Sequence, residues 1–329
     1  MKQLARVEYM VRHLRTVFPY ITFAKICNLL LNTLELRFIA SRPRSLPPYL
    51  KVEPTPLCQL ACPGCAHGTS DLKKQLSNRE HLSIDEFKKI LDPISHTLFG
   101  ISLSLRGEPM LGKELLPIIE YSHSKNVAVS FPTNLSLTLN EEKISRLVSS
   151  GVDAIFISLD GASAHTYGQY RVGGDFDLVL RNVKTIARIR ANLHRSRPRL
   201  IWKFVVLEHN RHEIAQVQNM YRKLGFDAYE LVEDYGSEAH KAARQTQNAK
   251  LIQQRKGCYW AWHTTTIRAD GIVAPCCLGH ESFQLGNTRT EDIVSIWRGE
   301  RYAQLRQGFN TMRTSDMNPV CARCLGVQN

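Results

Sequence analysis

The sequence predicts an α/β protein in which six strand–helix units form a parallel, partly open barrel, followed by a small second domain. From residue 47 to 235, short apolar runs alternate with longer amphipathic segments, which is typical of parallel strands covered by helices. From residue 258 onward, this alternation is replaced by a hairpin pattern and a terminal pair of cysteines. With 329 residues and 43% hydrophobic content, the chain is long and apolar enough for a packed core.

The six units follow one another in chain order. The expected strands have the sequences YLKVEPT, GISLSL, VAVSFPTN, DAIFISLDG, RLIWKFVVLEHN and AYELVE. The expected helices are SIDEFKKILDPI, KELLPIIEYSHSK, NEEKISRLVSSG, FDLVLRNVKTIARIRANL and RHEIAQVQNMYRKLG. The first should begin at a capping box of Ser83 and Glu86, and the third should end at Gly151. Because a full eight-unit barrel needs about 250 residues, we predict a partial (β/α)6 barrel of the TIM type.

Residues 1–46 form a basic, apolar N-terminal extension, with eight lysines and arginines against two glutamates. Its run ITFAKICNLLLNTLELRFIA is too interrupted by charge to span a bilayer, and suits one or two helices with a broad apolar face. Such helices could lie on an anionic membrane surface. We favour docking on the protein's own core, because burial is the commoner use of an apolar stripe. Cys27 is accordingly interpreted as a small buried hydrophobe.

The C-terminal part has a different organisation. Residues 236–257 are predicted to form a polar, basic linker helix, and residues 258–329 a small separate domain. In that domain TTTIRADGIVAPC alternates like a hairpin with its turn at 269–271, and TEDIVSIWRGERYAQLRQGF is helical.

Charge and cysteine content indicate which partners and which compartment to expect. A net charge of +13 favours anionic partners, or a basic surface that only aids solubility. The charge is spread along the chain without a recognition module, which argues against nucleic-acid binding. Nine cysteines without a preceding secretory signal predict a reducing, cytoplasmic compartment, where clustered cysteines indicate metal or catalytic ligands.

The first cysteine cluster, Cys58, Cys62 and Cys65, has the spacing C-x3-C-x2-C. It follows the first expected strand, at the end of a barrel where active sites are built. Three thiolates are one short of the four that close a structural zinc or iron–sulfur site. A cluster held by three cysteines leaves one iron open, whereas zinc would need a fourth ligand, for which His67 is the nearest candidate.

The second set comprises Cys258, Cys276, Cys321 and Cys324, with 17, 44 and 2 residues between successive members. Four ligands make a closed site for zinc or a [4Fe–4S] cluster. Cys277 is interpreted as a spectator, because adjacent residues of a strand point to opposite sides.

These motifs together resemble those of the radical S-adenosylmethionine (SAM) enzymes. C-x3-C-x2-C after the first strand, RGEP after the second and SLDG after the fourth carry the resemblance over residues 48–235. The spacing Cys258-x12-Gly271-x4-Cys276 with a terminal C-x2-C is similar to the SPASM/twitch extension. The short tail resembles the twitch form with one auxiliary cluster, as in a dehydrogenase acting on an amino-deoxy-inositol.

The resemblance implies two [4Fe–4S] clusters, a catalytic one on the three-cysteine set, with SAM as the fourth ligand, and an auxiliary one on the four-cysteine set. It implies SAM contacts from residues at three strand ends, whose alternative role is strand-end capping: Arg106, Gly107, Glu108, Pro109, Thr133, Asn134, Ser158 and Asp160. Arg106 stands where the family has glycine, and Gly64 stands where many members have a larger residue.

The implied activity is reductive cleavage of SAM to a 5′-deoxyadenosyl radical that abstracts a substrate hydrogen, with an electron donor such as flavodoxin or ferredoxin. Candidates for substrate contact or proton removal are Arg171, Lys203 and His209. We expect an oxidoreductase acting on a small polyol or amino-sugar alcohol, with the auxiliary cluster as electron acceptor.

Three alternatives stay open at this stage. The substrate could be a ribosomally made peptide, although no N-terminal leader-binding domain is recognised. It could be a lipid or lipid-linked molecule, as the basic, apolar N-terminus suggests, which would place the protein peripherally at the inner membrane surface. A non-catalytic protein with two structural zinc sites is the third.

Overall fold

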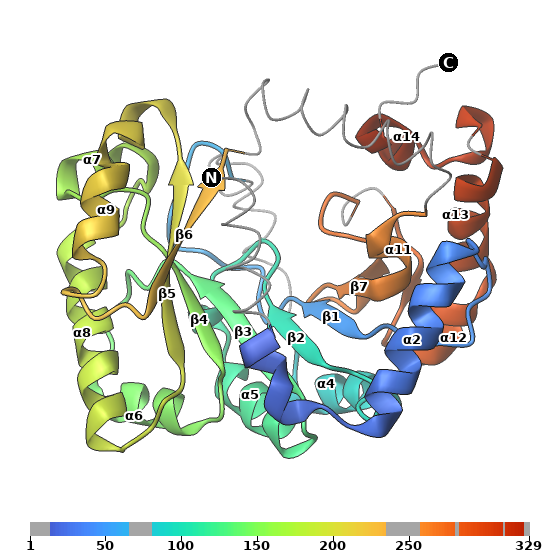
Figure 1. Ribbon diagram of the computed structural model, residues 1–329, viewed down its shortest axis with the longest axis horizontal. Helices are drawn as coiled ribbons and strands as arrows, with labels where there is room; N and C mark the ends of the chain where they lie inside the picture. The colour runs from blue at the N-terminus through green and yellow to red at the C-terminus, as the bar shows by residue number, and fades with distance from the viewer. Residues whose placement is uncertain (1–13, 66–80, 235–256, 280–282, 312, 326–329) are drawn as a thin grey trace.

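The computed structural model describes residues 14–65, 81–234, 257–279, 283–311 and 313–325. Its core is a nine-stranded sheet with the order β6-β5-β4-β3-β2-β1-β7-β8-β9 (Figure 1). Neighbours from β6 to β1 pair in parallel. This confirms the α/β class and the six parallel strands, which are β1 Tyr49–Val52, β2 Gly100–Leu103, β3 Ala128–Thr133, β4 Ala154–Ser158, β5 Arg199–Val206 and β6 Ala228–Glu233.

The helices that follow these strands lie where the sequence predicts them. They are α4 Ile84–Leu91, α5 Leu115–Ser124, α6 Glu141–Ser149, α8 Phe176–Asn192 and α9 Ile214–Met220, the last preceded by the 3-10 helix η4 Glu208–Glu213. The capping box at Ser83 is present, and Gly151 after α6 has a φ of +93°. A further helix, α7 Ala164–Tyr170, follows β4 and was not predicted.

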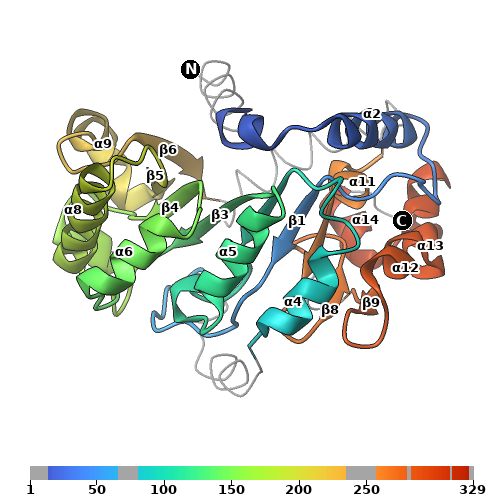
Figure 2. The same cartoon turned by 90° about the horizontal axis from the view of Figure 1, so that it is seen from below.

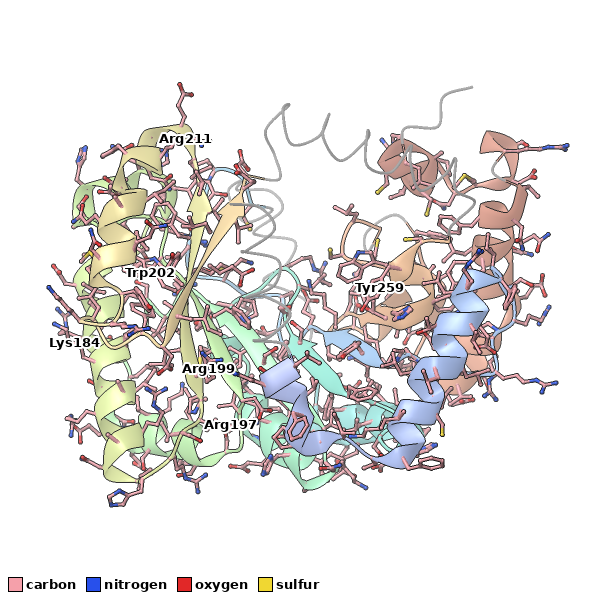
Figure 3. All side chains as sticks on the ribbon, viewed as in Figure 1. Lys184, Arg197, Arg199, Trp202, Arg211 and Tyr259 are labelled. Carbon is pink, nitrogen blue, oxygen red and sulfur yellow. The ribbon has the colours of Figure 1, made fainter. Side chains whose placement is uncertain are left out.

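The two faces of the sheet differ in polarity. Leu50, Val129 and Trp202 lie on one face and are at most 2% exposed. Helices α4, α5, α6 and α8 cover that outer face, and the Trp202 side chain points toward the helices (Figures 2 and 3). The opposite face is mixed: Pro132, Phe156, Ile201 and Val205 lie on it together with the half-buried polar residues Lys51, Ser102, Ser130, Ser158, Lys203 and Glu230.

The C-terminal region continues the same sheet. Strand β7 Thr264–Ile267 pairs in parallel with β1, and β8 Ile272–Ala274 pairs antiparallel with β7. The turn between them contains Gly271 at a φ of +81°, as the hairpin pattern predicts. Because β7 covers the edge of β1, that edge is not left to pair with another chain. The short β9 Gly286–Asn287 completes the sheet.

The remaining C-terminal elements are helical. The predicted helical segment forms two helices, α12 Ile293–Arg298 and α13 Glu300–Thr311, which separate at Gly299. The cysteine-bearing ends are also helical: α11 Tyr259–His263 follows the first cysteine of the set, and α14 Pro319–Leu325 carries the last two. Figure 1 shows this region beside β1, at the opposite side of the molecule from α8 and α9.

The N-terminal helix α2 Phe23–Arg37 docks on the protein by its polar side. Lys25, Asn28 and Asn32 are its buried residues. The expectation that its apolar stripe faces the core is therefore wrong, and so is the expected burial of Cys27, which is exposed. The reason is that the polar side chains find backbone acceptors. Asn28 Nδ2 donates to Leu46 O at 2.9 Å, and Asn32 Nδ2 donates to Trp262 O, in α11, at 2.6 Å.

Several predictions fall outside the described residues. The linker helix predicted at 236–257 lies outside the described residues except for residue 257, and neither His67 nor residues 1–13 are described. The division at 46, 235 and 257 stays a prediction. In the described part of the chain, none of the helices has the length and apolar character needed to cross a membrane.

Candidate active site

The three cysteines of the first cluster lie in the loop that follows β1. Cys62 is buried, and Cys58 and Cys65 are half-buried. Burial raises the pKa of Cys58 to about 11, and the charges of the other two thiols contribute to that rise. Burial and the charge of Cys65 likewise raise the pKa of Cys62. The three thiols are therefore close enough to act on one another electrostatically.

Glu108 connects the second and third strand ends. Its carboxylate accepts hydrogen bonds from the Thr133 hydroxyl at 2.6 Å and from the Asn134 backbone N–H at 2.7 Å. It is 3% exposed, and burial raises its pKa, while these two hydrogen bonds and a third from the Met110 N–H at 3.0 Å offset part of that rise. The charge of Glu108 also acts on Cys58. Four sequence-predicted residues from three loops are thus brought together.

Gln59 completes this group and was not predicted. Its Nε2 donates to Asn134 Oδ1 at 2.8 Å, and Asn134 Nδ2 lies 3.8 Å from Cys58 Sγ. An amide side chain next to the first cysteine was the signal that could have found it.

The RGEP segment packs closely against the residues that follow β1. A Cβ at Gly107 would lie 2.1 Å from Thr55 O, so only glycine fits there. Arg106 Nε and Nη2 donate to the two oxygens of Glu53 at 2.8 and 2.5 Å, and both side chains are buried. The Glu53 carboxylate also accepts from the Ala269 N–H of the β7–β8 turn at 3.2 Å. The Arg106 guanidinium thus joins the motif to the C-terminal hairpin through Glu53.

A second charged group approaches the cysteines from β4. Asp160 is fully buried, and its Oδ2 accepts from Arg171 Nε at 2.6 Å. Arg171 Nη1 lies 3.8 Å from Cys62 Sγ. Burial acts to lower the pKa of Arg171, but the charges of Asp160 and Cys62 outweigh it and hold that pKa above its usual value. Arg171 is therefore a permanent cation beside the cysteine cluster.

The glycine before the third cysteine makes room for an aromatic residue from another element. A Cβ at Gly64 would lie 2.8 Å from the Tyr170 hydroxyl oxygen. The Arg171 guanidinium lies 5.5 Å from the centre of the Tyr170 ring. Tyr170 ends α7, the helix that the sequence pattern did not reveal, although its neighbour Arg171 was singled out.

Lys203 and His209 lie on and after β5. Lys203 is paired in register with Ser158 on one side and Glu230 on the other. Burial lowers the pKa of Lys203, while the charge of Glu230 acts to raise it. His209 lies in η4, and its Nε2 is buried without a hydrogen-bond partner in the described part of the chain.

The second cysteine set comes together from three elements: Cys258 precedes α11, Cys276 follows β8, and Cys321 and Cys324 lie on α14. Tyr259 marks this region in Figure 3. Burial raises the pKa of Cys321 to about 12, and the charges of the other three cysteines of the set add to the rise. Burial also raises the pKa of Cys258 to about 11, with smaller contributions from Cys276 and Cys324.

The donor chemistry of both sets suits iron–sulfur clusters. Across the described residues, no three or more His, Cys, Asp or Glu side chains converge on the position of one metal ion. Each set instead offers partly buried thiols that act on one another, three in the first set and four in the second. Cysteine thiolates in these numbers are the ligands of [4Fe–4S] clusters.

Comparison with known families shows which family the chain belongs to. Residues 52–194 match the Radical SAM superfamily, and residues 258–325 match SPASM, an iron–sulfur cluster-binding domain. The chain belongs to the radical SAM superfamily and is an enzyme with a C-terminal SPASM domain. Its cofactors are SAM and [4Fe–4S] clusters, which decides against the protein with two structural zinc sites.

Two curated relatives illustrate the range of the family. The tungsten-containing aldehyde ferredoxin oxidoreductase cofactor-modifying protein of Pyrococcus furiosus is 24% identical over 346 residues, covering 84% of this chain and 94% of that one. The mycofactocin maturase MftC of Mycolicibacterium smegmatis is 28% identical over 136 residues, covering 41% of this chain. That match spans only 33% of the maturase.

Solved structures confirm the fold. Streptococcus suis SuiB bound to precursor peptide SuiA superimposes with a TM-score of 0.65 at 14% identity, covering 90% of this chain and 73% of that one. The AdoMet-bound structure of anSMEcpe gives a TM-score of 0.54 at 14% identity, covering 78% and 79% of the two chains. At these identities the likeness concerns the fold.

Proposed function

We propose that this enzyme removes a hydrogen atom from a hydroxyl-bearing carbon of a polar substrate and oxidises the alcohol, with the auxiliary cluster as electron acceptor. The substrate class is a small polyol or amino-sugar. When bound, SAM and the cluster on Cys58, Cys62 and Cys65 supply the radical chemistry. The protein's own residues bind and orient the reactants, exclude water and move the proton.

The observation that carries this proposal is a group of polar side chains on the inner face of the sheet, next to the cysteine loop. Lys51, Ser158, Lys203 and Glu230 lie half-buried on that face. Hydroxyl and amino groups of a sugar-like molecule can bond to these hydroxyl, amine and carboxylate groups, whereas an apolar chain would remove them from water without a new hydrogen bond.

Glu108 is assigned to the amino group of SAM. Its carboxylate is oriented by Thr133, Asn134 and the Met110 N–H, and these three donors leave one of its four lone pairs for the ammonium. A buried carboxylate and an ammonium make a strong charge-assisted hydrogen bond. Burial raises the pKa of free Glu108, and an arriving cation favours the ionised form. Asp160, Ser158 and the RGEP backbone complete the proposed SAM contacts.

Arg171 is assigned a positioning role. Its guanidinium joins Asp160 to Cys62 and adds positive charge beside a site that gathers thiolates. Such a cation stabilises the negative charge of a cysteine-bound cluster.

Lys203 is assigned as the base that takes the hydroxyl proton of the substrate. Oxidation of an alcohol releases a proton, and burial lowers the pKa of this amine, which favours its neutral, proton-accepting form. His209 is the second candidate, because its buried Nε2 has no partner in the described residues.

The auxiliary cluster is assigned to Cys258, Cys276, Cys321 and Cys324. Strands β7 and β1 are paired neighbours, so the hairpin that carries Cys276 is anchored to the strand that leads to Cys58. This anchoring supports an electron path between the two clusters. A small reductant such as flavodoxin or ferredoxin would supply the electron that starts the reaction.

A ribosomally made peptide is the second candidate substrate. It is suggested by SuiB, whose structure is bound to a precursor peptide, and by the mycofactocin maturase. A peptide is also polar along its backbone and would suit the same face.

The test is anaerobic incubation of the cluster-loaded enzyme with SAM and dithionite, followed by analysis of 5′-deoxyadenosine. Deuterium should pass into 5′-deoxyadenosine from polyols or amino-sugars labelled at the carbinol carbon. Transfer from a labelled peptide instead would assign the second candidate. Absence of 5′-deoxyadenosine from an enzyme holding both clusters would contradict the proposal as a whole.

A further inference from the structure

Residues 14–38 turn a continuous set of large apolar side chains outward. Among the described residues, fifteen large hydrophobic side chains are exposed, and nine of them belong to this short segment. Their exposed fractions run from 39% at Ile21 to 84% at Phe23. We call this set the outer apolar face; it consists of Leu14, Phe18, Ile21, Phe23, Ile26, Leu30, Leu31, Leu34 and Phe38.

The exposure follows from how α2 is anchored. Asn28 is bound to Leu46 in both directions, its Nδ2 donating to the carbonyl and its Oδ1 accepting from the N–H, each at 2.9 Å. Asn32 Nδ2 donates to Ser45 Oγ at 2.9 Å and to Trp262 O at 2.6 Å. The spacing of four residues between Asn28 and Asn32 puts both anchors on one side of the helix.

This anchoring leaves the apolar side no alternative partner within the described chain. Phe23, Ile26, Leu30 and Leu34 recur at the same helical spacing on the other side. Rolling the helix to bury them would expose the hydrogen-bonded asparagines and break their bonds to residues 45–46 and to α11. Exposure of the apolar side is therefore a stable feature of the fold.

The charge around the outer apolar face is positive. Arg15 and Arg37 are exposed within the segment. Its one carboxylate, Glu35, is turned inward, where it accepts from the backbone N–H groups of Arg44 at 2.6 Å and Ser45 at 3.1 Å. No exposed carboxylate lies among residues 14–38, all of which are described.

We propose that the outer apolar face docks the enzyme on a lipid bilayer with anionic headgroups. Apolar side chains would enter the boundary between headgroups and acyl chains, while the arginines meet the headgroup charges. Figure 2 shows residues 14–20 and α2 along the same side of the molecule, so both parts can meet one surface together.

Two other occupants fit this surface less well. A symmetric pair of copies would bring two sets of arginines together without a carboxylate of the segment to pair with them. A protein groove would accept one helix ridge, whereas this face extends beyond α2 into residues 14–21. The bilayer proposal does not depend on the proposed reaction.

The test is flotation of the full-length, cluster-loaded protein with vesicles containing about 30% phosphatidylglycerol in phosphatidylcholine, compared with phosphatidylcholine alone. The wild type should bind the anionic vesicles at least about tenfold more strongly than the neutral ones. Leu30→Asp should weaken binding to the anionic vesicles at least about tenfold. Arg37→Glu should lose about fivefold or more, and only on anionic vesicles.

Leu193→Asp is the matched control. Leu193 is a leucine at the end of α8 that is 42% exposed and lies outside the outer apolar face, so its variant should bind as the wild type does. Unchanged iron content and circular dichroism would show that the variants are folded.

Three outcomes would overturn the proposal. They are no flotation of the folded wild type with anionic vesicles, equal flotation of Leu30→Asp, and a lipid-free dimer that Leu30→Asp dissociates. The last would assign the outer apolar face to a second copy of the chain.

Discussion

Two adjacent cysteines of the C-terminal region, Cys276 and Cys277, are expected to differ in role. Cys276 and Cys277 are adjacent in the chain, yet only Cys276 contributes to the raised pKa values of Cys258 and Cys321. The expectation that Cys277 is a spectator assumed that both residues lie in a strand, but β8 ends at Ala274, so that reason does not hold and the role of Cys277 stays a prediction. The distinction can be tested directly by iron content.

We predict that Cys276→Ala loses one cluster, about four iron atoms per chain, whereas Cys277→Ala keeps both. The physical reason is that a [4Fe–4S] cluster needs four ligands in the auxiliary site. The measurement is anaerobic iron and sulfide analysis with the visible spectrum. Equal loss in both variants would show that Cys277 is a ligand.

Glu108→Gln should weaken SAM binding at least about tenfold, because a charge-assisted hydrogen bond to the ammonium is replaced by a neutral contact. Iron content should stay unchanged, which separates this effect from loss of the cluster. Equilibrium dialysis of SAM against the cluster-loaded enzyme measures it. Glu120→Gln, at an exposed position of α5, serves as the control; wild-type affinity in Glu108→Gln would refute the assigned contact.

At the scale of elements, the strands and helices of the barrel follow from local pattern, and α2 does not. Alternation along β1 to β5 already separates the residues that pack under helices from those that face the inner side. In α2, both sides of the helix are well defined, so the pattern predicts a helix but not which side meets the protein. That choice depends on partners far away in the chain, such as Asn126 and Trp262.

The cost of this arrangement is visible at Lys25, which is 1% exposed and donates to Asn126 O. Burial lowers its pKa from 10.5 to about 8. Between these values the unfolded chain holds more protons than the folded one, so stability rises with pH across that window. Below pH 8, the buried ammonium costs the fold its full penalty.

We therefore expect the free energy of unfolding of the wild type, relative to Lys25→Met, to increase by about 2 kcal/mol between pH 7.5 and pH 10. Urea unfolding of both proteins at the two pH values measures it. Groups that titrate in both proteins contribute equally, so their effect is absent from the difference between wild type and variant. Parallel pH profiles for the two proteins would contradict a buried ammonium at this position.

At the scale of the whole molecule, one sheet unites the radical SAM part and the SPASM region. Besides the β1–β7 pairing, Glu53 at the end of β1 binds Arg106 after β2 and the Ala269 N–H of the hairpin turn. This buried group holds three segments together, at the level of the active-site loops.

Glu53→Gln should destabilise the protein by about 3–5 kcal/mol, because it leaves the Arg106 guanidinium buried without its counter-ion. Urea unfolding of the cluster-loaded protein measures the loss. The double variant Glu53→Gln, Arg106→Met should recover part of it, since no unpaired charge then remains. A loss in the double variant equal to the sum of the two single losses would show that the pair is not coupled.

The sequence by itself determined the class of this protein. Strand alternation, the capping box at Ser83, the C-x3-C-x2-C spacing and the terminal C-x2-C are local patterns, and local geometry constrains them within a few residues. They were sufficient to predict the six parallel strands and the cysteine sets, and together with RGEP and SLDG they carried the family resemblance that implies the enzyme class.

Only the tertiary structure decided which distant residues meet. Arg106 finds Glu53, Tyr170 lies against Gly64, and Arg171 reaches Cys62, each across a separation that no periodicity encodes. The same holds for α2, whose polar side is turned inward by backbone carbonyls of other elements. Pairing between remote segments depends on how the sheet brings them together in space. A local sequence pattern does not encode which remote segments meet.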